Sequence, residues 1–438
     1  MGDPAASKGL IGPLIHRCQK CKAGEAREKF LRCRYCRAVR YCSIEHLRAD
    51  RSSHKSACKG ISKARVKLAK EDRLVRSLPA DGDMPANVFE TGVGKFWHFQ
   101  PTRDYLRTRY ILVERLHTLG TLDSYAQALK HMHDMMRLDR ADHLDVQDIA
   151  PYVMLSLDLD QESCDFIKGW GIQGRKIVKG TDIFESADSI LGVNNLYNPK
   201  ASSLLLRLKL LVDVINVMNA RKVLPLTPLP VEIQIIIEKN MVRSPLSAHL
   251  HKESTQALVE RRGKLVRGIL EFSQRLADDH NESFMFEFFH VALSVEPRRR
   301  PGLSYGEREA VMARRSYPAW RGTEGVLQLL DNAGACAMKT PVMNLKGMLY
   351  SYRDKLGQRY SRSAAEQLKY EILEVIWDYL PWAVEDATYL GPPAERPSER
   401  YRKLENERVF KNMEGMMFQN EHLKDAMRGL ASGNGVCE

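Results

Sequence analysis

Apolar residues recur every three to four positions along most of this chain, with charged and polar residues between them. From Tyr105 onward this spacing is typical of helices, and the alternation over four to eight residues that marks a half-buried strand is missing. Segments with the helical spacing include 255–278, 343–358, 363–382 and 401–430. The pattern predicts a mostly α fold, in which an all-α helical body follows an N-terminal region of different character.

The most apolar run, Leu204 to Met218, is interrupted by Arg207, Lys209 and Asp213. A membrane-spanning helix needs about 18 uninterrupted apolar residues, so we expect an amphipathic helix here and no membrane segment. The opening sequence MGDPAASKGL lacks the apolar core of a secretory signal and does not fit the myristoylation pattern. These features favour an intracellular protein, in the nucleus or the cytoplasm.

Two segments of the helical body share a layout 37 residues apart, and each is expected to begin the second helix of a pair. The matched positions are Leu122 with Leu159, Asp123 with Asp160, Ala126 with Ser163, and Leu129 with Phe166. A small residue at a helix–helix contact, followed by a large apolar residue, resembles the tetratricopeptide repeat (TPR), whose helix pairs recur about every 34 residues. The resemblance implies TPR-like helix pairs within residues 101–220.

Basic residues are concentrated at the N-terminal end of the chain. The formal net charge is +12, and residues 1–76 hold 20 Lys and Arg against 7 Asp and Glu, whereas the rest is close to neutral. The segment ISKARVKLAKEDRLVRSL, from Ile61, has a rough helical spacing and predicts a basic helix, followed by a Gly- and Pro-rich linker. Such a region attracts nucleic acid or an acidic protein, although Lys and Arg also keep a small domain soluble.

Cysteines and histidines cluster near the N-terminus in a pattern that suits a metal. Six of the nine cysteines lie between residues 18 and 58, whereas a disulfide-stapled domain spreads its pairs along its length. Their spacing, with two histidines, is Cys-x2-Cys-x11-Cys-x2-Cys-x5-Cys-x3-His-x7-His-x3-Cys. The candidate ligands are Cys18, Cys21, Cys33, Cys36, Cys42, His46, His54 and Cys58.

These eight residues form four pairs that suit Zn²⁺, which prefers four thiolate or imidazole ligands in a tetrahedral arrangement. A Cys-x2-Cys pair can bring both sulfurs to one metal through a tight turn. Residues four apart can do the same from one turn of a helix. The spacing predicts two zinc ions, and it permits either sequential or interleaved pairing of the half-sites.

The ligand order, together with the aromatic and apolar spacers of residues 35–43, resembles the MYND finger. The resemblance implies an interleaved cross-brace, with Cys18, Cys21, Cys42 and His46 around one zinc and Cys33, Cys36, His54 and Cys58 around the other. His46 stands where the family more often has a cysteine. Because protein ligands then fill every tetrahedral position, both zinc ions are expected to be structural, and no enzymatic activity is expected.

The same resemblance implies a protein–protein interaction adaptor, since MYND fingers bind short, proline-containing peptides in a surface groove. Tyr35, Tyr41 and Ile44 either line such a groove or form the finger's own small core. The helical body is expected to bind a second partner on an extended surface, as helical solenoids do. Transcriptional regulation is the commonest role among MYND proteins and favours the nucleus.

Two other functions stay open. Many MYND proteins with long bodies are SET-domain lysine methyltransferases, and Thr91–Lys95 faintly resembles the glycine-rich segment of that domain. However, the finger here precedes this segment, and the Asn-His dipeptide of the cofactor pocket does not occur in the chain. Nucleic-acid binding would use Arg32, Arg34, Arg37, Arg40 and Lys63–Arg76. Aromatic residues that could stack on bases are few in this region, which counts against recognition of a single strand.

The chain is too long for one compact core, and its patterns divide it into four regions. The sequence identifies neither the partners nor the oligomeric state. The regions are a finger at 1–60, a basic helix and linker at 61–100, a TPR-like region at 101–220 and a C-terminal helical region at 221–438.

Overall fold

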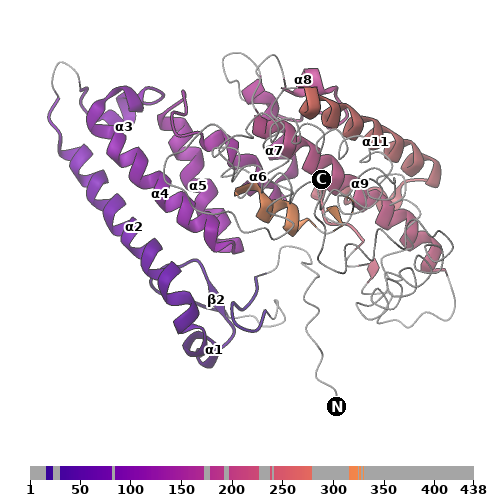
Figure 1. Cartoon of the computed structure of the whole chain (residues 1–438), viewed down its shortest axis with the longest axis horizontal. Coiled ribbons are helices and arrows are strands. Elements are labelled where there is room, and N and C mark those ends of the chain that lie inside the picture. Colours follow the sequence, from indigo (N-terminus) through magenta and orange to yellow (C-terminus); the bar gives the residue numbers. More distant parts are fainter. Residues whose placement is uncertain are drawn as a thin grey trace, which may run out of the picture. The chain divides into compact units, whose positions relative to one another are not determined.

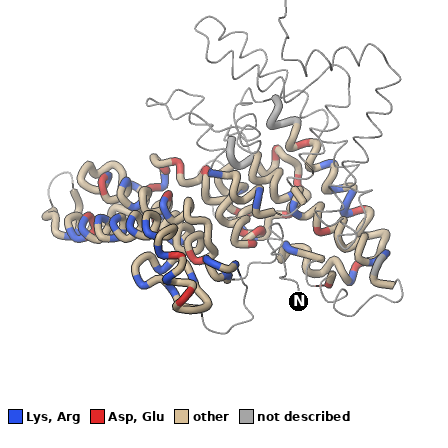
Figure 2. Tube along the Cα trace, turned by 60° about the horizontal axis from the view of Figure 1, so that its bottom comes forward, with Lys and Arg blue, Asp and Glu red and all other residues tan. Residues whose placement is uncertain are grey.

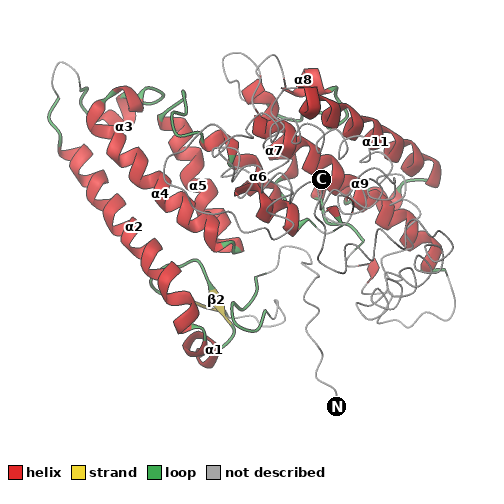
Figure 3. Cartoon of the chain, in the orientation of Figure 1, coloured by secondary structure: helices red, strands yellow, loops and turns green. Residues whose placement is uncertain are grey.

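Most of the described residues are helical, as the apolar spacing predicted (Figure 3). The structure, a computed structural model, describes residues 16–22, 30–80, 84–171, 178–191, 197–225, 237–238, 241–278, 315–323, 325–326 and 329. In these residues the strands β1 (Leu31–Arg32) and β2 (Arg40–Tyr41) form one small antiparallel sheet, with Leu31 opposite Tyr41. The helices expected at 343–358, 363–382 and 401–430 lie outside the described residues.

Successive helices pack on one another in chain order (Figure 1). They are α1 (Ile44–Ala49), α2 (Arg51–Ser77), α3 (Val88–Thr91), α4 (Arg103–Leu119), α5 (Leu122–Leu138), α6 (Ala150–Ser156), α7 (Asp160–Gly171), α8 (Ala187–Leu191), α9 (Tyr197–Val223) and α11 (Thr255–Asp278). Helix α2 packs on α4, and α4 to α8 then contact one another in sequence. Within the part of the chain described, no helix is both long and apolar enough to cross a membrane.

A glycine turn joins α4 to α5 and places the two helices side by side. Gly120 has a left-handed φ of 67° and ends α4, a conformation that glycine adopts without strain. Thr121 and Ser124 then form a reciprocal capping box, with bonds of 2.9 and 3.1 Å between each side chain and the other's backbone N–H. These caps explain why α5 begins at Leu122, within the segment predicted to begin a helix.

Helix α2 starts inside the finger and continues well beyond it. Its first two turns carry His54 and Cys58, and further along Ile61, Ala64 and Val75 are buried on the side that packs against α4. The boundary placed between residues 60 and 61 therefore falls inside a continuous helix. Buried residues of the finger and of α4 and α5 also belong to one apolar cluster, so the finger is packed onto the body.

The stretch expected to be a linker, up to residue 100, is packed into the same apolar cluster over residues 84–100. Val88 and Phe96 are buried, and the Phe96 ring lies 5.0 Å from that of Phe89 and 5.8 Å from that of Tyr105, measured between centroids. Aromatic side chains bury large apolar surfaces, and this outweighs the glycines and prolines that suggested an open linker.

Helix α9 lies at the centre of a second apolar cluster, and the prediction that residues 204–218 form an amphipathic helix was wrong. Every residue from 201 to 217 is buried, among side chains of α6, α7, α8 and α11. Even Arg207, Lys209 and Asp213 are only 2% exposed. The charged residues within the apolar run of α9 therefore make buried polar contacts and do not form a solvent-facing side.

Each of these three charges has partners inside the fold. Lys209 Nζ lies 2.5 Å from Asp158 Oδ1 and 2.8 Å from Asp160 Oδ1. Asp213 accepts the backbone N–H groups of residues 243 and 244, both over 2.9 Å, and the guanidinium of Arg207 covers the Phe272 ring at 3.7 Å. Burial lowers the pKa of Arg207 to about 10 and raises that of Asp213 to about 6.

The two segments matched as repeats begin helices, but their small residues lie in different surroundings. Ser163 on α7 is fully buried, whereas Ala126 on α5 is exposed and Ala128 is buried in its place. Helix α6, which would open the second pair, has 7 residues, against 17 in α4. Helix pairs are therefore present, but the matched small residues are not equivalent, and the TPR-like assignment stays a prediction.

Candidate metal centres in the finger

Both Cys-x2-Cys pairs fold into the same tight turn. The backbone N–H of Lys22 donates to the carbonyl of Cys18, and that of Arg37 to the carbonyl of Cys33, each over 2.9 Å. Lys22 and Arg37 have left-handed φ values of 58° and 54°, which cost a non-glycine residue roughly 1 kcal/mol. The two turns bring both thiols of each pair to one cluster of ligands.

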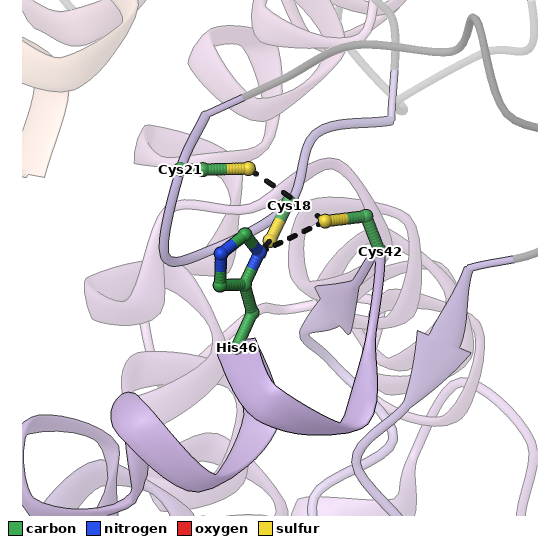
Figure 4. Close-up of side chains that lie close together, drawn as sticks. All are labelled: Cys18, Cys21, Cys42 and His46. Atoms are coloured by element: carbon green, nitrogen blue, oxygen red, sulfur yellow. Dashed lines mark hydrogen bonds between the residues drawn. The ribbon is translucent and has the colours of Figure 1, made fainter.

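The first cluster gathers Cys18, Cys21, Cys42 and His46 (Figure 4). Ser43 caps α1 by accepting the backbone N–H of His46 over 3.3 Å, which fixes the histidine one turn after Cys42. The Nδ1 atom of His46 lies 2.9 Å from Cys42 Sγ and 3.7 Å from Cys18 Sγ. The thiols of Cys21 and Cys42 are 3.7 Å apart.

The second cluster joins Cys33 and Cys36 to His54 and Cys58 on the first two turns of α2. Cys33 Sγ lies 3.6 Å from Cys58 Sγ, and Cys36 Sγ lies 3.4 Å from His54 Nε2. This histidine therefore presents Nε2 to its cluster, whereas His46 presents Nδ1.

The donor atoms of both clusters are spaced as a tetrahedral zinc ion requires. Zn–S distances of about 2.3 Å and Zn–N distances of about 2.0 Å place neighbouring ligand atoms roughly 3.5 to 3.8 Å apart. In each cluster all donor atoms lie within 4.8 Å of one another, and the sulfur pairs at 3.6 and 3.7 Å fit the expected edge. The Cys42–His46 separation of 2.9 Å is clearly shorter. The grouping is interleaved along the chain, as the MYND resemblance implied, and the residues fit two zinc ions.

The thiols differ in how readily they ionise. Burial opposes ionisation of Cys18, but the backbone N–H groups of Cys21 and Cys42 outweigh it and lower the pKa of this thiol to about 6. At Cys36, burial dominates and the charge of Cys33 adds to it, so the pKa rises to about 12. A divalent cation offsets the repulsion among thiolates, so a metal ion bound to the second cluster would favour the thiolate form of Cys36.

The finger is attached to the start of α5 by contacts that the sequence analysis did not predict. Asp123, in the first turn of α5, accepts two hydrogen bonds from Arg40 over 2.6 and 3.0 Å and one from Arg32 over 2.9 Å. Gln127, one turn later, donates to the carbonyl of Arg37 over 3.0 Å. An acidic residue in a first helical turn is common for reasons of the helix dipole alone, so the sequence carried no signal of this contact.

Arg65 makes a second attachment, from α2 to the back of the second cluster. It donates to the carbonyl of Cys36 over 2.9 Å and also to the side-chain oxygen of Gln127. Burial lowers the pKa of Arg65, whose side chain is only partly exposed, and its hydrogen bond to Cys36 makes it a structural contact of the finger. Its place in the basic segment Lys63–Arg76 had suggested a contact with nucleic acid instead.

The aromatic and apolar spacers of the finger divide into core and surface. Tyr41 is 1% exposed and donates its hydroxyl to Asp50 Oδ2 over 2.8 Å; burial, and then this carboxylate, raise its pKa. Tyr35 and Ile44, in contrast, are 59% and 53% exposed. Of the three residues considered for a peptide groove, Tyr41 therefore belongs to the finger's core, and Tyr35 and Ile44 remain available on the surface.

Comparison with known families matches residues 18–58 to the MYND finger. The chain thus carries a MYND finger, a zinc-binding module of protein–protein interaction, with its two Cys/His clusters in place. The match does not extend to the helical body. Comparison with curated proteins and comparison with solved structures each gave no match.

Proposed function

We propose that this protein is an adaptor, in which the MYND finger binds a peptide segment of one partner and the helical body binds a second partner. The observation that carries the proposal is the exposure of Tyr35 and Ile44 on a finger whose other aromatic spacer, Tyr41, is buried. In a segment this small, apolar side chains left in solvent are surface that a partner can cover.

The partner segment is a short, proline-containing peptide. An extended polyproline-like segment loses little conformational entropy on binding, and it docks readily against exposed aromatic side chains. Leu31, 39% exposed at the start of the finger's sheet, adds a third apolar side chain.

Zinc in this proposal is structural, and the protein is not an enzyme. Each cluster supplies four protein donors, and a tetrahedral zinc with four protein ligands has no open position for a water or a substrate. A SET-type methyltransferase would bind S-adenosylmethionine, so a calorimetric titration of the full-length protein with this cofactor tests the point. We expect no heat of binding, and a saturable signal would contradict this part of the proposal.

The helical body provides the second binding surface, as TPR-like and related helical arrays do. Support comes from its successive packing, in which each helix from α4 to α8 contacts the next. The adaptor works inside the cell, in the nucleus or the cytoplasm, because thiolate ligands persist in a reducing compartment. A role in transcriptional regulation would favour the nucleus, which localisation of a fluorescent fusion tests.

The experiment for the finger compares proteins captured by the intact chain with those captured by a Tyr35→Ser, Ile44→Ser variant. A matched control, Val259→Ser, Leu270→Ser, removes apolar side chains that are 45% and 38% exposed on α11. Partners that bind the control but not the finger variant, with zinc content unchanged, would support recognition by the finger. Identical partner sets for all three proteins would overturn it.

A further inference from the structure

The solvent-facing side of α2 carries a row of lysines. Lys55, Lys59, Lys63 and Lys67 follow one another four residues apart, and Lys70 continues the row; all five are exposed. Residues at this spacing lie along one face of a helix, and the buried Ile61, Ala64 and Val75 lie on the opposite one. In Figure 2, Lys and Arg recur along the trace of α2, with few acidic residues among them. We call these five side chains the lysine face.

The positive charges of the lysine face are not balanced by acidic residues on the same part of the helix. From Arg51 to Lys70 the sequence contains no Asp or Glu, and none of the five lysines forms an ion pair with a described residue. Like charges four residues apart on a helix destabilise it by about 0.2 to 0.5 kcal/mol per pair. A face that served solubility alone would relieve this by alternating Glu with Lys, as exposed helices commonly do.

In the structure, some of the basic residues that the sequence suggested for nucleic-acid binding are engaged in contacts within the protein. Arg32 and Arg40 are bound to Asp123, and Arg65 points to the carbonyl of Cys36. Part of the charge of these arginines is therefore paired within the protein. Arg34 and Arg37 of the finger stay exposed, but on α2 the lysine face is a continuous row of exposed charge.

The composition of this face suits binding to phosphate groups better than binding to a protein surface. Protein–protein interfaces are depleted in lysine, whereas interfaces with nucleic acid are strongly positive. From Lys55 to Lys70 the helix rises about 22 Å, a length over which one strand of a duplex carries roughly six phosphates. Five flexible ammonium groups can follow such a strand as point charges without a fixed register.

A duplex is favoured over a single strand because α2 offers no stacking surface. Helix α2 contains no Phe, Tyr or Trp, and single-strand binding relies on such side chains to stack with bases. We propose that the lysine face of α2 binds the phosphate backbone of a double-stranded nucleic acid without reading its sequence. This binding activity is separate from peptide recognition by the finger, since it uses neither Tyr35 nor Ile44.

The test is a fluorescence-anisotropy titration of the full-length, zinc-loaded protein with a labelled 20-base-pair DNA duplex of arbitrary sequence, from 50 to 200 mM salt. Five phosphate contacts predict a slope of log K against log salt of about −4 to −5. In the variant Lys59→Gln, Lys63→Gln, Lys67→Gln, the slope should weaken by about three and the affinity at 100 mM salt should fall roughly a hundredfold. Circular dichroism and zinc content should not change, because these side chains are exposed and Gln suits a helix as well as Lys.

A matched control, Lys130→Gln, Lys252→Gln, Arg267→Gln, removes the same charge from exposed positions elsewhere. It should change the affinity less than about threefold, since distant exposed charges are largely screened. Equal losses in both variants would show that net charge alone drives binding and would overturn the proposal. Failure to bind the duplex would overturn it too, as would tighter binding of a single-stranded 20-mer. Binding of poly-glutamate in place of the duplex would assign the face to an acidic protein.

Discussion

Arg40 and Asp123, 83 residues apart in the chain, join the finger to the helical body through a paired hydrogen bond. Nε and Nη2 of the arginine donate to the two carboxylate oxygens over 2.6 and 3.0 Å, a geometry that fixes orientation as well as distance. Burial opposes ionisation of Asp123, but the bonds from Arg40 and the charge of Arg32 outweigh it and lower the pKa of the carboxyl. The finger is therefore held in one orientation on α5.

We expect Asp123→Asn to loosen the finger without unfolding either part. The neutral amide loses the charge-assisted bonds to Arg40 and Arg32, which at this partly buried site should lower the free energy of unfolding by about 1 to 3 kcal/mol. Hydrogen exchange should show reduced protection at β2 and the start of α5. Asp104→Asn, whose carboxylate is 74% exposed, is the control and should change neither measurement. Equal protection in wild type and Asp123→Asn would show that the pair does not hold the finger.

The second cluster is coupled to α2 because two of its candidate zinc ligands, His54 and Cys58, lie on that helix. We expect Cys33→Ser, Cys36→Ser to bind one zinc per chain in place of two, measured by elemental mass spectrometry. The first turns of α2 should then lose protection from hydrogen exchange, while the part packed on α4 keeps it.

Cys164→Ser is the matched control for this experiment. Cys164 is a buried cysteine of α7 outside both clusters, so its variant should retain two zinc ions. Two zinc ions in the double variant as well would contradict the assignment of Cys33 and Cys36 as ligands.

Sequence spacing was sufficient to predict which cysteines and histidines cluster, because each half-site is local. Two cysteines three residues apart, or a histidine four residues from a cysteine, meet through one turn of backbone whatever the rest of the chain does. The interleaving of the half-sites came from family resemblance alone. The choice of Nδ1 at His46 and Nε2 at His54 depends on side-chain rotation, which no spacing encodes.

Contacts between distant segments escaped prediction for a physical reason. The bonds of Asp123 to Arg40 and of Arg65 to the carbonyl of Cys36 need the packing of α2, α4 and α5 to be known first. The charged residues of α9 were wrongly predicted to face solvent for a similar reason. An apolar run with three charged residues has the same sequence pattern whether those charges face water or buried partners. For Lys209, the two cases are distinguished by the carboxylates of Asp158 and Asp160, which lie about 50 residues earlier in the sequence.

Lys209 should therefore be among the most sensitive positions of the body. In Lys209→Met, the buried carboxylate of Asp160 and the partly buried one of Asp158 lose this cation, and breaking a buried pair by removing one partner typically lowers the free energy of unfolding by about 3 to 5 kcal/mol. Adding Asp160→Asn should restore part of this, because it removes one uncompensated charge. Urea unfolding gives the comparison, with the exposed Lys222→Met on the same helix as control. A loss no larger than that of the control would show that Lys209 is not needed to neutralise the carboxylates.

The burial of His117 should make the stability of the helical body depend on pH. This side chain on α4 is 8% exposed, and burial, with the nearby charge of Arg315, lowers its pKa to about 4. In the unfolded chain an imidazole takes up its proton near pH 6.5, about 2.5 units higher, so acidification below that pH favours the unfolded state. The stability lost in this way should reach roughly 2 to 3 kcal/mol by pH 4.5.

His117→Phe keeps a ring beside Tyr125, whose centroid lies 5.7 Å from that of His117, and removes the titrating group. We expect the difference in unfolding free energy between variant and wild type to be constant above pH 7.5 and to shift in favour of the variant as pH falls from 6.5 to 4.5. Protonation of the zinc-binding histidines affects both proteins equally, so the difference isolates His117. A difference that stays flat across this range would mean that the imidazole takes up its proton as readily in the folded protein as in the unfolded chain.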